Sequence, residues 1–442
     1  MIDLRQALRF DEYSQMAFVG AGGKSSTIFH LARDFAKPIL ISTSTHLGED
    51  QKAQADQHLI ITKTDQIKNL EIENLTGSLL LTGSLIEGNR WAALSAEQLN
   101  LLSGLARKSK IPLLIEADGS RQKPLKAPAD HEPAIPNFVD QVVVVSGISA
   151  IGKPLSSETV HRPEQFAKLS GIKMGDLIEI NGLVKVVTHL EGGLKHIPAK
   201  SRKVWLANQA DSAEKLSLIK KVAPEVLEKF DSVVGGAINS EKPNYLRFER
   251  IGGVLLAAGE SKRFGEAKQL LNWRGESFIK NVANVMQAAR LLNGVIVLGA
   301  NYQNIFPEVE SLGLRIVMNE EWSSGQASSV KQGLAALPKH VGGAMFLQVD
   351  RPQISVSLIN ALVDEHSKSV SPIIAPQIDG QRATPVLFDR VTFPEFAQLE
   401  GDQGGRQLFS KYRVNWIPWL DTSQAIDVDT PEDFVRLQNY EN

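Results

Sequence analysis

The sequence predicts an α/β protein built from two doubly wound domains. Short apolar runs, typical of buried strands, alternate with longer amphipathic stretches, typical of helices, and this alternation is the pattern of βαβ units. The pattern restarts at residue 253, after a polar segment at residues 239–245 that contains Pro243. We therefore expect one domain over residues 1–245 and a second over residues 246–442.

The apolar runs give the expected strands in order. In the first domain they are residues 16–20, 39–42, 59–61, 79–81, 112–115, 142–146, 204–207 and 233–235, and in the second domain residues 253–258, 294–298, 315–318, 345–349 and 373–375. The expected helices are residues 25–35, 96–108, 160–169, 278–291, 327–336, 355–365 and 431–437. Because helices separate the strands, we expect mostly parallel sheets.

The composition is balanced in charge and contains no cysteine. The 442 residues include 48 Lys and Arg against 50 Asp and Glu, whereas a general nucleic-acid binder carries a surplus of basic residues. The lack of cysteine excludes disulfides, thiolate nucleophiles, Cys-ligated zinc and iron–sulfur clusters. No apolar run approaches the ~18 to 20 residues of a membrane span, and the first residues lack a signal-peptide pattern. We expect a cytoplasmic protein with no nucleic-acid or membrane partner.

A glycine-rich segment follows the first expected strand and precedes the first expected helix. Its glycines would let the backbone approach a phosphate closely, while Lys24 would bind phosphate oxygens and the Ser25 hydroxyl would bind Mg²⁺. The predicted nucleotide-binding residues are Gly20, Gly22, Gly23, Lys24, Ser25 and Ser26. Phe18 stands where the full Walker A spacing would place glycine, so the match is the shorter G-x-x-G-K-S. We expect ATP or GTP here, and the alternative is a strand-to-helix turn without a ligand.

Two carboxylates follow the expected strand at residues 112–115. Glu116 or Asp118 would hold a metal ion or a water molecule, although Asp118 could equally cap a turn. Thr43 and His46 close a neighbouring expected strand at the same edge, where His46 is as readily a packed or surface residue as a catalytic one.

A second segment of small residues follows the strand that opens the second domain. Small residues at a strand end let backbone N–H groups close around a triphosphate, and Arg263 and Lys268 would add positive charge. The predicted nucleotide-binding residues of this segment are Leu256, Ala257, Ala258, Gly259 and Ser261.

Carboxylates recur beyond two later segments of the second domain. Asp350 follows an apolar strand, at the place where α/β folds bind ligands, and could hold Mg²⁺. Asp429 is predicted as a further metal ligand, with Asp427 as its substitute, although Asp429 or Thr430 would also suit a helix N-cap before Pro431.

Residues 251–442 resemble the molybdenum cofactor cytidylyltransferases (MocA-like) of the nucleotidyltransferase superfamily. The motifs that carry the resemblance are residues 256–259 through Lys268, Asn319, residues 324–329, 350–352, 401–406 and 427–433. The resemblance implies a Rossmann-like (GT-A-like) fold, CTP as substrate, and a nucleotide that also lies against Gly325, Ser328 and Ser329. It implies Arg263, Lys268, Asp350 and Asp429 as catalytic residues, with Mg²⁺ on Asp350 and Asp429.

Two departures from this family fall on the side of the acceptor. Relatives usually carry Gln where Arg351 stands, and a Gly with a polar residue within the segment 382–385. Guanylyl-transferring relatives tend to carry Gly-Gly where Ala258 and Gly259 stand, so the resemblance implies CTP rather than GTP.

Residues 1 to about 245 resemble the selenium-dependent molybdenum hydroxylase accessory proteins (YqeC-like). The matching stretches are residues 19–26, 42–46, 116–119, 123–126, 132–133, 152–155 and 161–164. The resemblance implies a P-loop-like accessory domain and a molybdenum hydroxylase apoenzyme as a partner.

The two resemblances together predict a bifunctional protein of molybdenum cofactor maturation. The second domain would transfer CMP from CTP to a phosphorylated molybdopterin-type acceptor and release pyrophosphate. The alternatives are a nucleotidyltransferase that acts on a sugar or polyol phosphate and a carrier or chaperone that binds the cofactor without turnover.

Overall fold

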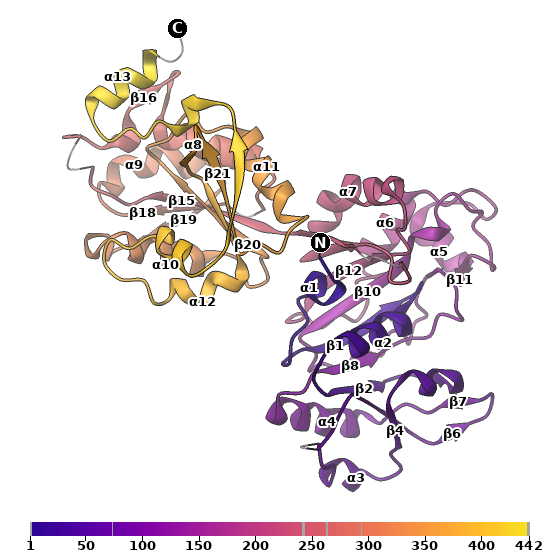
Figure 1. Cartoon of the computed structure of the whole chain (residues 1–442). Helices are drawn as coiled ribbons and strands as arrows, with labels where there is room; N and C mark the ends of the chain where they lie inside the picture. Colours follow the sequence, from indigo (N-terminus) through magenta and orange to yellow (C-terminus); the bar gives the residue numbers. More distant parts are fainter. Residues whose placement is uncertain (1, 73, 241–243, 262–263, 293, 440–442) are drawn as a thin grey trace. The chain divides into compact units, whose positions relative to one another are not determined.

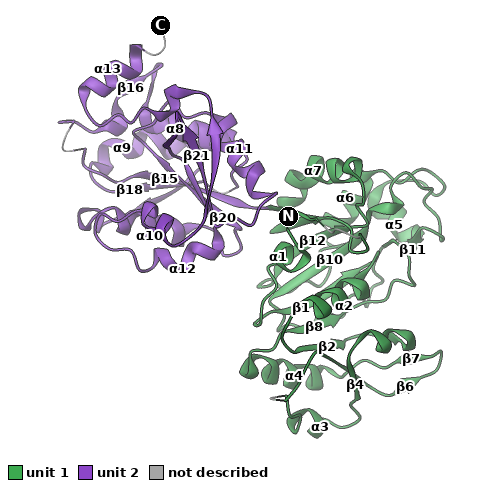
Figure 2. Cartoon of the chain, in the orientation of Figure 1, with its two compact units in different colours: residues 1–248 green, residues 249–442 purple. Residues whose placement is uncertain are grey.

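The structure is a computed structural model that describes all residues except 1, 73, 241–243, 262–263, 293 and 440–442 (Figure 1). The chain divides into two compact units, residues 1–248 and residues 249–442 (Figure 2). The boundary expected after residue 245 falls just before strand β14 (Leu246–Glu249), which belongs to the sheet of unit 1.

Unit 1 is organised around one large sheet, with nine strands among the described residues. Their order is β14, β13 (Ser232–Gly235), β12 (Arg202–Asn208), β10 (Gln141–Gly147), β1 (Gln15–Gly20), β8 (Leu113–Glu116), β2 (Ile39–Thr43), β5 (Ser78–Thr82) and β4 (Gln57–Ile60). The neighbouring strands from β13 to β4 run parallel. Every residue of β2, β5, β8 and β10 is buried, as expected for parallel strands that are covered on both faces.

Some of the helices of unit 1 begin at a capping side chain. The helices of this unit are α1 (Leu4–Leu8), α2 (Lys24–Asp34), α3 (Asp65–Lys68), α4 (Ala96–Ser109), α5 (Pro163–Ser170), α6 (Ile180–Thr188) and α7 (Ala213–Leu227). Ser95 and Gln98 form a capping box at the start of α4. The helix expected from residue 160 begins only at Pro163, whose fixed φ suits a first helical position, and residues before it form the short strand β11 (Val160–His161).

Short strands complete unit 1. They are β3 (Leu47–Gly48), β6 (Leu85–Ile86) and β7 (Arg90–Trp91), which form a small antiparallel sheet, and β9 (Leu125–Lys126), which pairs with β11.

Unit 2 has a mixed sheet. Its order is β19 (Arg315–Met318), β18 (Gly294–Leu298), β15 (Ile251–Ala257), β20 (Gly343–Gln348), β23 (Val386–Asp389), β21 (Ile373–Ile378) and β22 (Gln381–Arg382), with β24 (Val414–Trp419) paired to β21. The strands from β19 to β20 are parallel, whereas β23 runs antiparallel to both β20 and β21. Strands β23 and β24 were not expected, because no helical stretch precedes the four-residue strand β23 and β24 is only partly buried.

Helices cover both faces of the sheet of unit 2 (Figure 1). They are α8 (Phe278–Ala288), α9 (Tyr302–Val309), α10 (Gln326–Ala336), α11 (Val356–His366), α12 (Phe393–Phe396) and α13 (Pro431–Asn439), and β16 (Asn272–Trp273) and β17 (Glu276–Ser277) form a hairpin before α8. Phe278, Ile305 and Leu358 bring α8, α9 and α11 into one core cluster, and Val330 and Phe396 bring α10 and α12 into the other.

The predicted α/β class with largely parallel sheets is confirmed. Within the part of the chain that the structure describes, there is no helix with the length and apolar character that a membrane span requires. Strands β1 and β15 lie in the interior of their sheets, so the loops that follow them open at the edge where other parallel strands also end.

Candidate functional site

Three carboxylates of unit 2 converge beyond the end of β20. Asp350, Asp427 and Asp429 each offer one oxygen atom, and these atoms all lie within 4.8 Å of one another. The Val428 N–H donates a hydrogen bond of 3.1 Å to the Asp350 backbone carbonyl, which joins the segment after β20 to the segment before α13. Asp427, predicted as a substitute for Asp429, therefore lies together with both predicted metal ligands.

The chemistry of this cluster fits a hard divalent cation. Burial, together with the neighbouring Asp427 and Asp429, raises the pKa of Asp350 to about 6, although Lys268 and Arg351 act in the opposite direction. Asp350 Oδ1 and Asp427 Oδ1 are buried without a hydrogen-bond partner among the described residues. Mg²⁺ and Mn²⁺ bind carboxylate oxygens, so a cation at this point would satisfy both atoms.

Lys268 lies against the same carboxylates. Its Nζ donates to Asp429 Oδ1 at 2.8 Å and to the Val428 carbonyl at 2.9 Å, and it lies 3.5 Å from Asp350 Oδ2. Burial would lower the pKa of Lys268, but the charges of Asp350 and Asp429 outweigh it and raise the pKa. The structure thus brings together three of the four predicted catalytic residues, while Arg263 lies outside the described residues.

The loop between β15 and Lys268 is held by a glutamine that the sequence analysis did not single out. Gln269 Nε2 donates to the Ala257 carbonyl at 3.0 Å and to the Gly259 carbonyl at 2.8 Å. The Lys268 N–H donates to Ser261 Oγ at 3.2 Å. The available signal in the sequence was a glutamine next to the apolar pair Leu270 and Leu271. Gln269 is buried, and a buried polar side chain needs a hydrogen-bond partner.

The remaining small residues form the end of β15. Leu256 is half-buried, whereas Ala257 and Ala258 are buried and Gly259 is exposed. The Ala258 carbonyl and methyl group lie against Gly299, where an added Cβ would come within 2.8 to 2.9 Å of them. The Ala258 methyl is therefore part of a tightly packed wall.

A second loop pair lies at the start of α10. Gly325 has φ +115°, and an added Cβ would lie 2.2 Å from the Gly401 backbone carbon. Asn319 Nδ2 donates to Ser328 Oγ and to Ser329 Oγ, both at 2.9 Å. Ser329 is buried and Ser328 is half-buried, so only Ser328 keeps a partly open hydroxyl among these predicted nucleotide contacts.

The two family departures have separate structural roles. The Arg351 guanidinium is buried and donates to the Gln424 and Ala425 carbonyls, both at 3.2 Å, so it holds the segment that carries Asp427. In the second departure, Ala383 is buried and the Thr384 hydroxyl donates to Gln348 Oε1 at 3.4 Å. Arg382 before them is exposed, and its guanidinium lies 6.0 Å and 5.7 Å from the ring centres of Phe409 and Trp416.

The glycine-rich loop of unit 1 joins β1 to α2. Gly20, Gly22 and Gly23 have φ values of 94°, 83° and 121°, and an added Cβ on Gly22 would lie 2.3 Å from the Gly147 backbone nitrogen. The helix begins at Lys24, and the Thr27 N–H is bonded to the Gly23 carbonyl at 2.9 Å. The N–H groups of residues 24–26 therefore have no acceptor within the helix.

This loop lines a cavity of about 960 Å³. The cavity residues include all the predicted loop residues from Gly22 to Ser26. Glu116, His46, His131 and Arg162 line it as well. A cavity of this size is within the range of small-molecule and cofactor sites.

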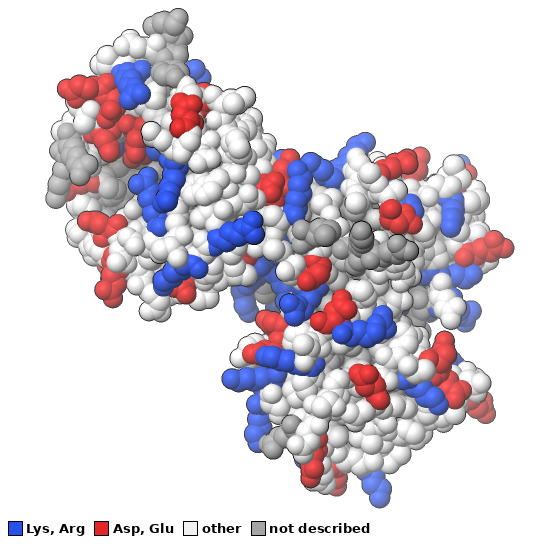
Figure 3. Space-filling view, in the orientation of Figure 1, with Lys and Arg blue, Asp and Glu red and all other residues white. Residues whose placement is uncertain are grey.

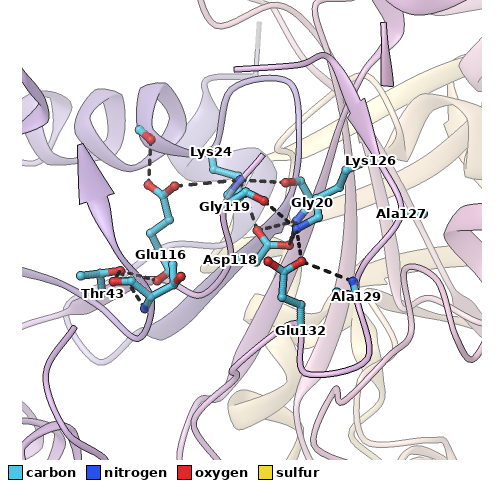
Figure 4. A network of polar contacts seen from close by, with 12 residues as sticks. Gly20, Lys24, Thr43, Glu116, Asp118, Gly119, Lys126, Ala127, Ala129 and Glu132 are labelled. Atoms are coloured by element: carbon cyan, nitrogen blue, oxygen red, sulfur yellow. Dashed lines mark hydrogen bonds and ion pairs between the residues drawn. The ribbon is translucent and has the colours of Figure 1, made fainter. Parts of the chain in front are cut away.

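A buried network fixes the base of the loop (Figure 4). Asp118 accepts the Gly20 N–H at 3.0 Å and lies 3.2 Å from Lys24 Nζ and 2.8 Å from Lys126 Nζ. Lys126 also donates to Glu132 Oε2 at 2.8 Å. The Asp118 side chain is 2% exposed and does not line the cavity, so both of its oxygens serve the network.

Of the two carboxylates at and after the end of β8, Glu116 is the one that lines the cavity. Its Oε2 accepts the Ser25 hydroxyl at 2.7 Å, and its Oε1 lies 3.9 Å from Lys24 Nζ. Burial raises the pKa of Glu116, with the Asp118 charge acting in the same direction. The open choice between Glu116 and Asp118 is thereby narrowed by geometry to Glu116 beside Ser25. Lys24 Nζ meanwhile donates to the Gly20 carbonyl at 2.7 Å.

Basic residues line this cavity or lie close to it. Burial, together with the charges of Arg162, Lys126 and Arg121, lowers the pKa of His161 to about 4, so its imidazole is neutral at pH 7. Burial would raise the pKa of Glu132, but Lys126 and Arg162 outweigh it and lower the pKa to about 2. Lys126 and Glu132 were not among the predicted site residues, because Glu132 lies in an irregular segment and Lys126 ends a strand of only two residues, too short for a periodicity to mark.

Charge elsewhere on the molecule is mixed. On the face drawn in Figure 3, Lys and Arg side chains are interspersed with Asp and Glu side chains over both units. This distribution agrees with the balanced charge of the sequence.

Two family descriptions match the two units separately. The family described as YqeC protein matches residues 16–164, and the family described as MobA-like NTP transferase domain matches residues 253–416. The two matches fall within unit 1 and unit 2 respectively.

Relatives of known sequence repeat this division. The uncharacterized protein YqeC of Escherichia coli (strain K12) is 32% identical over 204 residues, which cover 45% of this chain and 77% of that protein. Nicotine blue oxidoreductase of Paenarthrobacter nicotinovorans is 34% identical over 201 residues, or 42% of this chain and 95% of that protein. "Probable molybdenum cofactor guanylyltransferase" of Bacillus mycoides (strain KBAB4) is 27% identical, over 42% of this chain and 94% of its own length.

Among solved structures, the crystal structure of Rv0371c from Mycobacterium tuberculosis H37Rv aligns with 43% of this chain and 98% of its own, at 26% identity and a TM-score of 0.40. The same protein has been crystallised with manganese. From the family matches and the similarity to YqeC and the transferase relatives, the chain belongs to the YqeC family through unit 1 and carries a MobA-like NTP transferase domain in unit 2.

Proposed function

We propose that unit 2 transfers CMP from CTP to the terminal phosphate of a molybdopterin-type acceptor and releases pyrophosphate. The observation that carries the proposal is the convergence of three carboxylates with Lys268 beside the loop that follows β15. A transferase that acts on phosphate groups needs this combination, because its main task is to position phosphates and to offset their charge.

The acceptor phosphate serves as its own nucleophile. Its second pKa is about 6, so it is largely dianionic at neutral pH and needs no general base. One acceptor oxygen forms a bond to the α-phosphorus of CTP, and the bond from that phosphorus to the bridging oxygen breaks. The electron pair of the broken bond leaves with pyrophosphate.

The residues of the cluster divide this work. Asp350, Asp427 and Asp429 would hold a divalent cation such as Mg²⁺, which supplies charge neutralisation and a template for the triphosphate. Lys268 already lies at these carboxylates, so occupation of Asp429 by a cation would free its ammonium to bind a phosphate oxygen. Arg351 keeps the Asp427 segment in place from the opposite side.

The choice of CTP is supported by the methyl group of Ala258, which is packed against Gly299 after the end of β15. We expect this methyl group to leave less room beside the base than a glycine would, which suits a pyrimidine better than a purine. One methyl group in a pocket changes specificity by ~1 to 3 kcal/mol, so we expect CTP to be favoured over GTP about 10- to 200-fold. The relative named as a guanylyltransferase makes GTP the alternative to be tested.

Pyrophosphate release tests the proposal. We expect release from CTP that depends on a molybdopterin-type acceptor and Mg²⁺, with kcat/KM above that for GTP and ATP. Asp350→Asn should abolish release, because it removes a metal ligand without removing core volume. The control is Asp379→Asn, since Asp379 is an exposed turn residue with φ 49°, a conformation that asparagine tolerates.

The outcomes separate the parts of the proposal. Full activity in Asp350→Asn with saturating Mg²⁺ would contradict the assigned centre. A kcat/KM for GTP equal to or above that for CTP would contradict only the choice of CTP. Pyrophosphate release with a sugar or polyol phosphate instead of a molybdopterin-type acceptor would contradict the choice of acceptor.

We further propose that unit 1 binds ATP or GTP at its glycine-rich loop and acts as an accessory domain toward a molybdenum hydroxylase apoenzyme. The N–H groups of residues 24–26 and the cavity of about 960 Å³ support a phosphate site. Ser25 and Glu116, in contact at 2.7 Å, are the pair that would hold Mg²⁺.

A further inference from the structure

The segment that follows β12 is tied to the glycine-rich loop by one buried side chain. Asn208, the last residue of β12, is 4% exposed. Its Nδ2 donates to the Gly22 carbonyl at 2.7 Å, and its Oδ1 accepts the Ile238 N–H at 3.2 Å. Asn208 thereby links the loop after β1 to the segment after β13.

The strand order sets the distance between the segment after β12 and the glycine-rich loop after β1. The order β12, β10, β1 separates β12 from β1 by two strand spacings, roughly 10 Å, and the three strands are parallel. Their carboxyl ends therefore share one edge. This separation is comparable with that between the phosphates and the base of an extended nucleotide.

The cavity connects the two places. It is lined by the loop from Gly22 to Ser26 and also by Gln209, the residue after Asn208. The Gln209 side chain is held by Ser149, whose hydroxyl donates to Gln209 Oε1 at 2.6 Å. A nucleotide whose phosphates lie on the loop would therefore extend its base toward the end of β12.

Asp211 presents a carboxylate just beyond this point. It lies three residues after Asn208, at most roughly 11 Å away along the chain, and directly precedes the N-cap of α7. Its side chain is 63% exposed and pairs with Lys215 at 2.7 Å. An exposed ion pair of this kind is weak, so a ligand can readily replace Lys215.

We propose that unit 1 selects guanine nucleotides and that Asp211 reads the base. This inference rests on the phosphate-binding role proposed above for the glycine-rich loop. A carboxylate is an acceptor only, and guanine presents two adjacent donors, N1–H and the 2-amino group. Adenine presents an unprotonated N1 next to a C2–H, so the same carboxylate meets a lone pair and forms neither bond.

Calorimetric titration of the full chain with GDP, ADP and XDP tests the proposal. The component that belongs to unit 1 is the one lost in Lys24→Ala, which separates it from binding by unit 2. We expect this component to favour GDP over ADP and XDP by at least about tenfold, because hydrogen bonds to a charged group are strong.

Asp211→Asn gives a change of preference that misfolding cannot produce. The carboxamide can donate to the 2-oxo group of xanthine and accept its N1–H, so GDP should bind at least about tenfold more weakly and XDP more tightly. The matched control is Glu214→Gln, an exposed acid in the first turn of α7, which should leave both affinities unchanged.

Two different results would overturn two different claims. If Lys24→Ala removes no nucleotide binding, the phosphate-binding role of the loop is wrong. If Lys24-dependent binding exists but does not distinguish the bases, or if Asp211→Asn leaves the GDP-to-XDP ratio unchanged, the guanine assignment is wrong.

Discussion

Lys24 and Lys268 each lie against carboxylates of their own unit. Lys24 Nζ is 3.2 Å from Asp118, and Lys268 Nζ is 2.8 Å from Asp429. A largely buried ammonium needs acceptors, and nearby carboxylates supply them until a phosphate or a metal ion changes the balance of charge. The motifs predicted both lysines and both carboxylates as site residues, but not the two ion pairs, because each pair joins segments that are 94 or more residues apart.

Glu132→Gln should destabilise unit 1 at neutral pH. It should also make the free energy of unfolding of unit 1 less dependent on pH in the acid range. The pKa of Glu132 falls from 4.5 to about 2 because Lys126 and Arg162 outweigh burial. A carboxyl group with a lowered folded pKa stabilises the fold above pH ~4.5, and this contribution disappears as the pH falls toward ~2. The full shift corresponds to roughly 3 to 4 kcal/mol at neutral pH, as an upper bound.

Hydrogen exchange of the peptides that cover β1 and β8 measures this effect. Wild-type protection should fall between pH 4.5 and pH 3 more steeply than that of Glu132→Gln, after correction for intrinsic exchange. Glu191→Gln is the control, because the Glu191 carboxylate also pairs with a lysine, Lys195, but is itself exposed. Parallel profiles for wild type and Glu132→Gln would contradict the prediction.

At the scale of elements, the two sheets differ in how well their strands can be predicted. The strands of unit 1 are apolar along their whole length and separated by helices, so the periodicity locates them. In unit 2, β23 is four residues long and β24 is only partly buried, so neither produces a clear pattern. Hydrophobic periodicity also does not locate the first residue of a helix. The helix expected from residue 160 begins at Pro163, which suits the first helical position.

Gly325→Ala should separate the loop before α10 from the loop that contains Gly401. The new Cβ would lie 2.2 Å from the Gly401 backbone carbon and would adopt φ +115°. We expect kcat/KM for nucleotidyl transfer to fall about 100-fold, or ~2.7 kcal/mol, while the circular dichroism spectrum is retained. The control is Gly313→Ala, where φ is +70° but no atom lies within 4 Å, so only strain of about 1 to 2 kcal/mol is added. Equal losses in both variants would show that strain, not the contact between the loops, decides activity.

At the scale of the whole molecule, each unit has its own sheet and its own core. The core cluster of unit 1 includes Tyr245, whose ring is fully buried and lies where a Cβ on Gly236 would be 2.2 Å from it. The Tyr245 N–H donates to the Ile2 carbonyl at 3.1 Å. The segment that the sequence marks as a linker therefore ends in a residue of the first core, which polarity and a proline alone could not reveal.

Division of the chain at the observed boundary should give two folded fragments. Residues 1–248 keep Tyr245 and most of β14, and residues 249–442 keep the complete site at Asp350 and Lys268. We expect the second fragment to retain nucleotidyl transfer within about twofold of the full chain, because its core clusters contain residues of unit 2 alone. A shorter fragment, residues 1–240, lacks the Tyr245 ring, and loss of a buried aromatic side chain costs about 3 to 5 kcal/mol. Thermal unfolding of the two N-terminal fragments measures the difference: equal midpoints would place the boundary earlier in the chain, and an unfolded second fragment would mean that unit 2 depends on unit 1.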